Sequence, residues 1–124
     1  MVWSVKIAAS ILVGLVAALH LYFLVLEMFL WQKPKGRELS GLDIHMARAT
    51  APLAANQGLY NGFLAAGLLW GLAEPNPTGL HFTVFFLLCA MIAGAYGAVT
   101  VSRRILWVQF APAAVALALA LAVR

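Results

Sequence analysis

A histidine and a glutamate, His20 and Glu27, lie inside the first long apolar stretch of the 124-residue chain. They are seven positions apart, nearly two turns of an α-helix, so both side chains fall on one helix face. A carboxylic acid and an imidazole are common partners in general acid–base catalysis. Polar side chains are also costly inside a bilayer and therefore mark candidate functional sites. We predict His20 and Glu27 as candidate catalytic residues.

Further polar side chains interrupt the later apolar stretches. The predicted ligand-binding residues are Asn56, Gln57, Tyr60, Asn61, Tyr96 and Gln109. If neighbouring helices run antiparallel, these residues fall in the same half of the membrane as Glu27, which would lie opposite Asn56 and Gln57. The other half is almost purely apolar, with Thr83 as the small exception. The pattern predicts a polar pocket that opens on one side of the membrane, and it is not typical of a through-pore.

The same residues also have a purely structural interpretation, which stays open. Asn and Gln side chains hold membrane helices together by hydrogen bonds, and Glu27 can pair with Arg37, Arg48 or Arg103 instead of a ligand. A metal site is not predicted, because one histidine and one carboxylate fall short of the usual three or four ligands. Adding His45 completes a set of two histidines and one carboxylate, which is a minor alternative. No cofactor is predicted.

The elements that must position these residues are predicted to be membrane spans. The chain is 65% hydrophobic, against roughly 45–50% for ordinary soluble proteins. Its 8 Lys+Arg and 4 Asp+Glu are too few to cover a soluble domain of this size. The apolar residues form blocks long enough to span a bilayer, at approximately 5–30, 53–73, 80–101 and 105–123. We therefore expect a single all-α domain over residues 1–124, an integral membrane four-helix bundle.

The connections between the spans carry their own signals. The polar segment after the first span predicts a short interfacial helix over residues 40–51, with Ser40 or Asp43 as its N-cap. The run 74–79, which is rich in proline and glycine, ends the second span. Pro112 lacks a backbone N–H and predicts a kink in the last span.

The distribution of basic residues predicts the orientation. Six of the eight lie in the first and third connections: Lys33, Lys35, Arg37, Arg48, Arg103 and Arg104. Only Lys6 and Arg124 lie on the other side, so the positive-inside rule places both termini outside the cytoplasm. Because the basic residues flank apolar blocks and form no stripe, nucleic-acid binding is not expected. The basic run 33–37 is interpreted as a topology determinant, with phosphate or lipid headgroup binding as the alternative.

Glycine pairs indicate how the second span packs. Gly58 and Gly62 form one GxxxG pair, and Gly67 and Gly71 form another. At 100° per residue the two pairs face nearly opposite directions, as expected of a central helix that contacts neighbours on both sides. The lone Cys89 lies in an apolar stretch and predicts no disulfide.

Taken together, these residues resemble a family of small bacterial membrane proteins called domain of unknown function 1304. The resemblance covers essentially the whole chain, and its most specific part is the run Asn56-Gln57-Gly58-x-Tyr60-Asn61-Gly62. Its other parts are His20-x6-Glu27-Met28-x2-Trp31, Gly94-Ala95-Tyr96-Gly97 and Val108-Gln109. The resemblance implies four transmembrane helices in a bacterial protein. It implies no activity and no catalytic residues, so the candidate site rests on the physical argument.

Three functional hypotheses follow for a multi-pass protein of the bacterial inner membrane. The leading one is a cytoplasm-facing intramembrane pocket that binds, and in its stronger form transforms, a small lipid-like or isoprenoid-like amphiphile. The first alternative is a small proton-coupled transporter that acts as a dimer. The second is a non-catalytic accessory subunit of a larger membrane complex. The expected partners are membrane lipids, together with a second copy of the chain or a larger complex.

Overall fold

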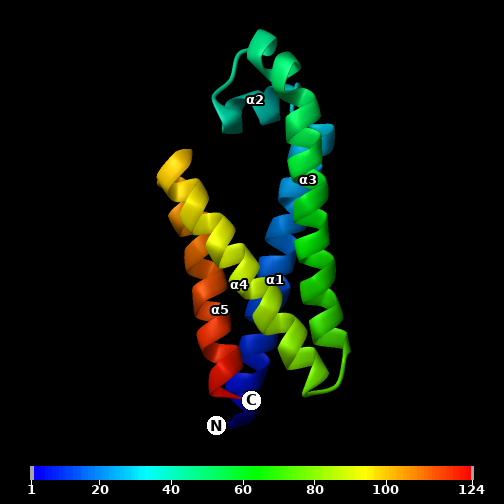
Figure 1. Ribbon diagram of the computed structural model, residues 1–124, viewed down its shortest axis with the longest axis vertical. Coiled ribbons are helices and arrows are strands. Elements are labelled where there is room, and N and C mark those ends of the chain that lie inside the picture. Colours follow the sequence, from blue (N-terminus) through cyan, green and yellow to red (C-terminus); the bar gives the residue numbers. More distant parts are fainter. Residues whose placement is uncertain (1, 124) are drawn as a thin grey trace. The chain divides into compact units, whose positions relative to one another are not determined.

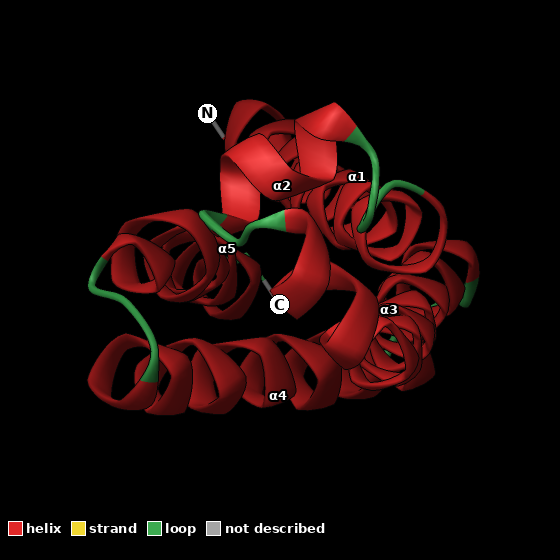
Figure 2. Cartoon of the chain, turned by 90° about the horizontal axis from the view of Figure 1, so that it is seen from above, coloured by secondary structure: helices red, strands yellow, loops and turns green. Residues whose placement is uncertain are grey.

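The computed structural model describes residues 2–123, and every regular element in this range is a helix (Figure 2). In chain order they are α1 (Val2–Phe29), α2 (Pro34–Ser40), α3 (Ile44–Ala73), α4 (Thr78–Thr100), the π-helical turn η1 (Leu106–Phe110) and α5 (Ala111–Ala122). The all-α prediction is confirmed. Arg124, which was counted toward the orientation, lies outside the described residues.

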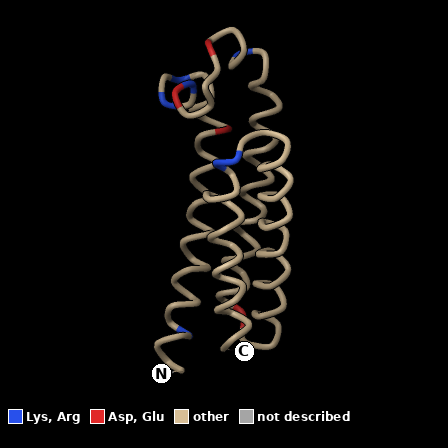
Figure 3. The backbone as a smooth tube through the Cα atoms, turned by 90° about the vertical axis from the view of Figure 1, so that its left-hand side faces the viewer, with Lys and Arg blue, Asp and Glu red and all other residues tan. Residues whose placement is uncertain are grey.

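Among the described residues, two helices are long and apolar enough to cross a membrane. α1 has 28 residues and α4 has 23, or about 42 and 35 Å of helix against a hydrocarbon core of about 30 Å. Lys and Arg, like Asp and Glu, are found mainly at the ends of the helices and in the connections (Figure 3). The final helical stretch, Leu106–Ala122, is apolar and shorter. α3 has 30 residues but carries the polar side chains of the candidate site, which lower its hydropathy.

The chain forms two compact units. Residues 18–63 make the smaller unit, and residues 1–17 together with 64–124 make the larger one. Both boundaries fall within continuous helices, α1 and α3, and neither falls in a linker. The single domain expected over residues 1–124 stays a prediction.

Four helical segments build the core of the larger unit. They are the first part of α1, the last part of α3, α4 and α5, with α4 and α5 side by side (Figure 1). Their buried side chains are Val13, Val16, Ala17, Ala65, Leu68, Leu87, Ala90, Ala113 and Ala116. Many of these residues are small, which lets neighbouring helices approach closely, as is usual where dispersion contacts hold membrane helices together. These segments form the helix bundle that the sequence predicts.

The last predicted span is two kinds of helix joined end to end. Residues Leu106–Phe110 form the π turn, in which the N–H of Ala111 donates to the carbonyl of Leu106, and α5 follows. Pro112 comes directly after this turn and has no N–H to donate. π turns are a known way for a helix to absorb such an interruption. Near Pro112, where the sequence predicts a kink, the structure has a change from a π turn to an α-helix.

The short helix of the first connection lies earlier than predicted. α2 ends at Ser40, where Gly41 adopts the left-handed conformation with φ 76°, and residues 44–51 belong to α3. The predicted range 40–51 is therefore wrong, because Gly41 ends one helix just before the next begins. The predicted cap is confirmed: the Asp43 Oδ1 accepts the N–H of Met46 at 2.8 Å.

Gly94 and Gly14 provide a matched test of close packing in the larger unit. A Cβ at Gly94 would lie 2.7 Å from the backbone nitrogen of Phe110, whereas a Cβ at Gly14 would meet nothing within 4 Å. We expect Gly94→Ala to destabilise the protein by about 1–3 kcal/mol, because backbone must move. Gly14→Ala should be neutral or stabilising, since alanine is the better helix former. Equal thermal denaturation midpoints of the two variants in detergent would contradict the close approach of α4 and η1.

Candidate functional site

A carboxylate and an amide meet in the smaller unit. The Nδ2 of Asn61, on α3, donates a hydrogen bond to the Oε1 of Glu27, on α1, at 2.6 Å. Asn61 is 4% exposed and Glu27 is half-buried. Hydrogen bonds to a charged acceptor are short and among the stronger ones in proteins. The sequence analysis expected Glu27 to face Asn56 and Gln57, so the observed partner lies about one turn further along α3.

Two glycines explain why these side chains can touch. A Cβ at Gly58 would lie 3.1 Å from the Cβ of Glu27 and 3.2 Å from the carbonyl oxygen of Leu24. A Cβ at Gly62 would lie 2.7 Å from the Cδ1 of Leu24. Because glycine presents no side chain here, α1 and α3 approach closely and the short Asn61 side chain reaches the carboxylate.

His20 lies on α1 at a different level from Glu27. Its side chain is 0% exposed, and its ring meets the ring of Phe23 edge to face, with centroids 5.4 Å apart. Seven residues of helix separate His20 from Glu27, or about 10 Å along the axis. Glu27 hydrogen-bonds to Asn61, on the other helix. The predicted acid–base pair thus shares a helix, with its two members about two turns apart.

The other predicted polar residues of α3 are exposed, two of them on a different face of the helix. Asn56 and Gln57 are exposed, and Tyr60 is 58% exposed. At 100° per residue Asn56 and Tyr60 lie 140° and 100° from Asn61, whereas Gln57 lies 40° from it. The structure therefore brings Glu27 and Asn61 together and leaves Asn56, Gln57 and Tyr60 outside their contact.

Tyr96 and Gln109 belong to the larger unit. Tyr96 is on α4 and 72% exposed, and Gln109 is half-buried in η1. Glu27 and Asn61 both belong to the smaller unit. A pocket that Glu27 and Asn61 share with Tyr96 and Gln109 therefore stays a prediction.

A hollow of about 420 Å³ adjoins Glu27 in the smaller unit. Its lining combines an acid, a cation and an amide with apolar walls: Glu27, Met28, Phe29, Trp31, Gln32, Lys33, Ile44 and Ala51. Pockets of small-molecule sites commonly measure roughly 300–1,000 Å³ and pair apolar walls with a few polar groups. The hollow thus has the size and composition to hold an amphiphilic molecule.

The tryptophan of this hollow is fixed by a short hydrogen-bond chain. The Nε1 of Trp31 donates to the Oγ1 of Thr50 at 2.9 Å, and that hydroxyl donates to the carbonyl of Met46 at 2.7 Å. Sequence reasoning named Trp31 within the family resemblance and did not single out Thr50. The sequence feature that could have indicated this contact is that Trp31 and Thr50 lie near opposite ends of the connection between the first two predicted spans.

The described residues contain no cluster suited to a metal ion. Nowhere in residues 2–123 do three His, Cys, Asp or Glu side chains gather as ligands. Glu27 meets the Asn61 amide, and His45 is exposed at the start of α3. The set of two histidines and one carboxylate that the sequence left as an alternative is therefore not assembled within this range.

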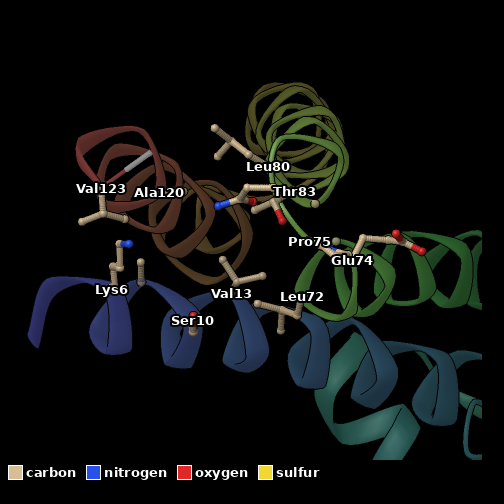
Figure 4. Close-up of a pocket in the computed structure, with 14 residues that line it drawn as sticks. Lys6, Ser10, Val13, Leu72, Glu74, Pro75, Leu80, Thr83, Ala120 and Val123 are labelled. Atoms are coloured by element: carbon tan, nitrogen blue, oxygen red, sulfur yellow. The ribbon is translucent and has the colours of Figure 1, made fainter. Parts of the chain in front are cut away.

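The larger unit contains a second hollow, of about 340 Å³, which sequence reasoning missed (Figure 4). The helix segments around it were predicted to be almost purely apolar, with Thr83 as the exception. The hollow is instead lined by Lys6, Ser10 and Thr83 together with small residues, among them Ala9 and Gly79. The signal was present in these small and hydroxyl-bearing positions, but only the packing of four segments brings them together.

Comparison with known proteins identifies a family and no activity. A family model described as "Protein of unknown function (DUF1304)" matches residues 14–121. The matched range contains His20, Glu27 and Asn61 and nearly the whole chain. No curated protein and no solved structure matches the chain.

Proposed function

The chain belongs to the DUF1304 family, and we propose that it is a membrane protein that binds a small amphiphilic molecule beside Glu27. The observation that carries the proposal is the hollow of about 420 Å³ that Glu27 shares with Lys33 and Gln32. These three residues would meet the polar head of the ligand. The apolar walls of the same hollow would hold its lipid-like or isoprenoid-like body.

The Asn61 contact suits Glu27 to this role. Asn61 binds one carboxylate oxygen, Oε1, and thereby fixes the plane of the group. The second oxygen then serves as an acceptor for a hydroxyl or amine of the ligand, while Lys33 meets a carbonyl or anionic oxygen. The same carboxyl is a proton-transfer group, which is the means by which the site would transform its ligand.

The proposed setting is a bacterial inner membrane crossed several times. Basic side chains of the first and third connections, such as Lys33 and Arg103, outnumber those at the other helix ends six to two. This bias supports a cytoplasmic position for both connections and an outer position for both termini. The hollow beside Glu27 would then open toward the cytoplasm. Close helix contacts at Gly58 and Gly62 suit packing within a bilayer.

One observation favours a second candidate function, that of a non-catalytic accessory subunit. Asn56, Gln57 and Tyr60 are exposed on α3. Polar side chains within a membrane helix usually pair with another helix, because lipid offers them no hydrogen bonds. A partner protein or a second copy of the chain on this face would satisfy them.

Native mass spectrometry of protein extracted gently from its own membrane distinguishes the two candidates. We expect the unmodified protein to carry a small amphiphile and Glu27→Gln to lose it, because glutamine keeps the shape of the group and removes its charge. Asn56→Ala is the matched control on the exposed face and should retain the molecule. Retention by Glu27→Gln as well would refute the site, and a protein partner lost from Asn56→Ala would establish the accessory role.

Orientation is tested by reporter fusions. A reporter that is active only in the cytoplasm should be silent when fused after the C-terminus and active when inserted between Lys33 and Arg37. The expected reason is the six-to-two bias of basic residues. The reverse pattern would invert the protein and place the hollow beside Glu27 on the outer side.

A further inference from the structure

The second hollow forms where α1 begins, α3 ends and α4 begins. Figure 4 shows Lys6 and Val123 on one side of it, Glu74 and Pro75 on the other, and Thr83 between them. All its lining residues belong to the larger unit. None of them contributes to the hollow beside Glu27, so the function of this second hollow can be considered on its own.

The hydroxyl of Thr83, a largely buried residue, faces this hollow. Thr83 is 6% exposed, and its Oγ1 lies against Gly71, where an added Cβ would come within 2.5 Å of it. Both residues line the hollow. Within residues 2–123 no hydrogen bond is recorded for the Thr83 hydroxyl. No fully enclosed side-chain oxygen or nitrogen of the described residues lacks a partner, so this hydroxyl is open to the hollow and can donate to a molecule bound there.

One cationic side chain, that of Lys6, faces the hollow. Lys6 lines it, as do Gly79 and Leu80 in the first turn of α4. The N-terminus of a helix carries partial positive charge, which favours an anion. The N–H of Gly79 itself donates to the carbonyl of Pro75 at 3.0 Å. Glu74 also lines the hollow, but its Oε1 accepts the indole N–H of Trp70 at 3.1 Å. In Figure 4 its carboxylate is turned away from Lys6.

The remaining walls are mostly apolar, with Ser10 and Asn76 as polar exceptions. They come from α1, α3 and α5, with Val13, Leu72, Ala120 and Val123 among them. A free inorganic anion gains nothing from such walls, whereas the glycerol and upper acyl chain of a lipid bury apolar surface against them. The combination of an anion site and apolar walls matches a phospholipid.

We propose that this hollow binds the phosphate of a membrane phospholipid headgroup. Lys6 and the first turn of α4 meet the negative charge, and the Thr83 hydroxyl donates to a phosphate oxygen. The apolar walls hold the glycerol and the start of an acyl chain. This binding site is separate from the one beside Glu27 and does not depend on the ligand proposed there.

The test is a titration of delipidated protein in detergent, read by native mass spectrometry. The probes are phosphatidylglycerol, diacylglycerol with the same acyl chains, and inorganic phosphate. We expect phosphatidylglycerol to bind at least about tenfold more tightly than diacylglycerol, the scale of one charge-assisted hydrogen bond. Lys6→Gln and Thr83→Val should each lose most of this difference. Thr83→Ser keeps the hydroxyl and should retain it, as should the control Lys35→Gln on α2.

Each other outcome overturns the proposal. Equal binding of phosphatidylglycerol and diacylglycerol would show that no phosphate site exists. Undiminished binding by both Lys6→Gln and Thr83→Val would place the lipid elsewhere, and inorganic phosphate that displaces the lipid at equal concentration would make this a free-phosphate site. If Thr83→Val does not fold, Lys6→Gln and Thr83→Ser still decide. Glu27→Gln should bind phosphatidylglycerol like the parent, which separates this result from the fate of the site beside Glu27.

Discussion

The close approach of α1 and α3 at Gly58 is the constraint on which the candidate site depends. A carboxylate that is half-buried between apolar helices is unfavourable unless it is hydrogen-bonded. Glu27 meets this condition through Asn61, and the asparagine side chain is short. The contact requires the close approach at Gly58, where an added Cβ would lie 2.7 Å from the Cγ of Met28 and 3.2 Å from the carbonyl oxygen of Leu24. A larger residue at position 58 would have to displace the Met28 side chain and shift the α1 backbone at Leu24.

The helices themselves could be predicted because their signal is local. Block length and hydropathy placed the first span at 5–30, and α1 covers Val2–Phe29. The second span was placed at 53–73, yet α3 begins at Ile44 and continues past Pro52. Hydropathy reports which residues can enter a bilayer and does not show where a helix begins. Asp43 carried the better signal, because its carboxylate caps α3.

The site was harder to predict because it depends on how two helices slide past each other. Glu27 and Asn61 were both recognised as candidates, but Glu27 was expected opposite Asn56 and Gln57. A shift of about one turn follows from packing Leu24 against Gly62, a contact that no single-sequence pattern specifies. The second hollow was missed for a similar reason, since Lys6 and Thr83 approach only after four segments of the larger unit have packed.

Glu27 serves a ligand or only holds α1 to α3, and both roles depend on its contact with Asn61. That contact is therefore the first quantity to measure. A double-mutant cycle with Glu27→Ala and Asn61→Ala, followed by unfolding in detergent, measures it directly. We expect a coupling free energy of about 0.6–2 kcal/mol, the range for interhelical hydrogen bonds in membranes. The parallel cycle of Glu27→Ala with Asn56→Ala should be additive within about 0.5 kcal/mol. Additivity in both cycles would contradict the contact and the site built on it.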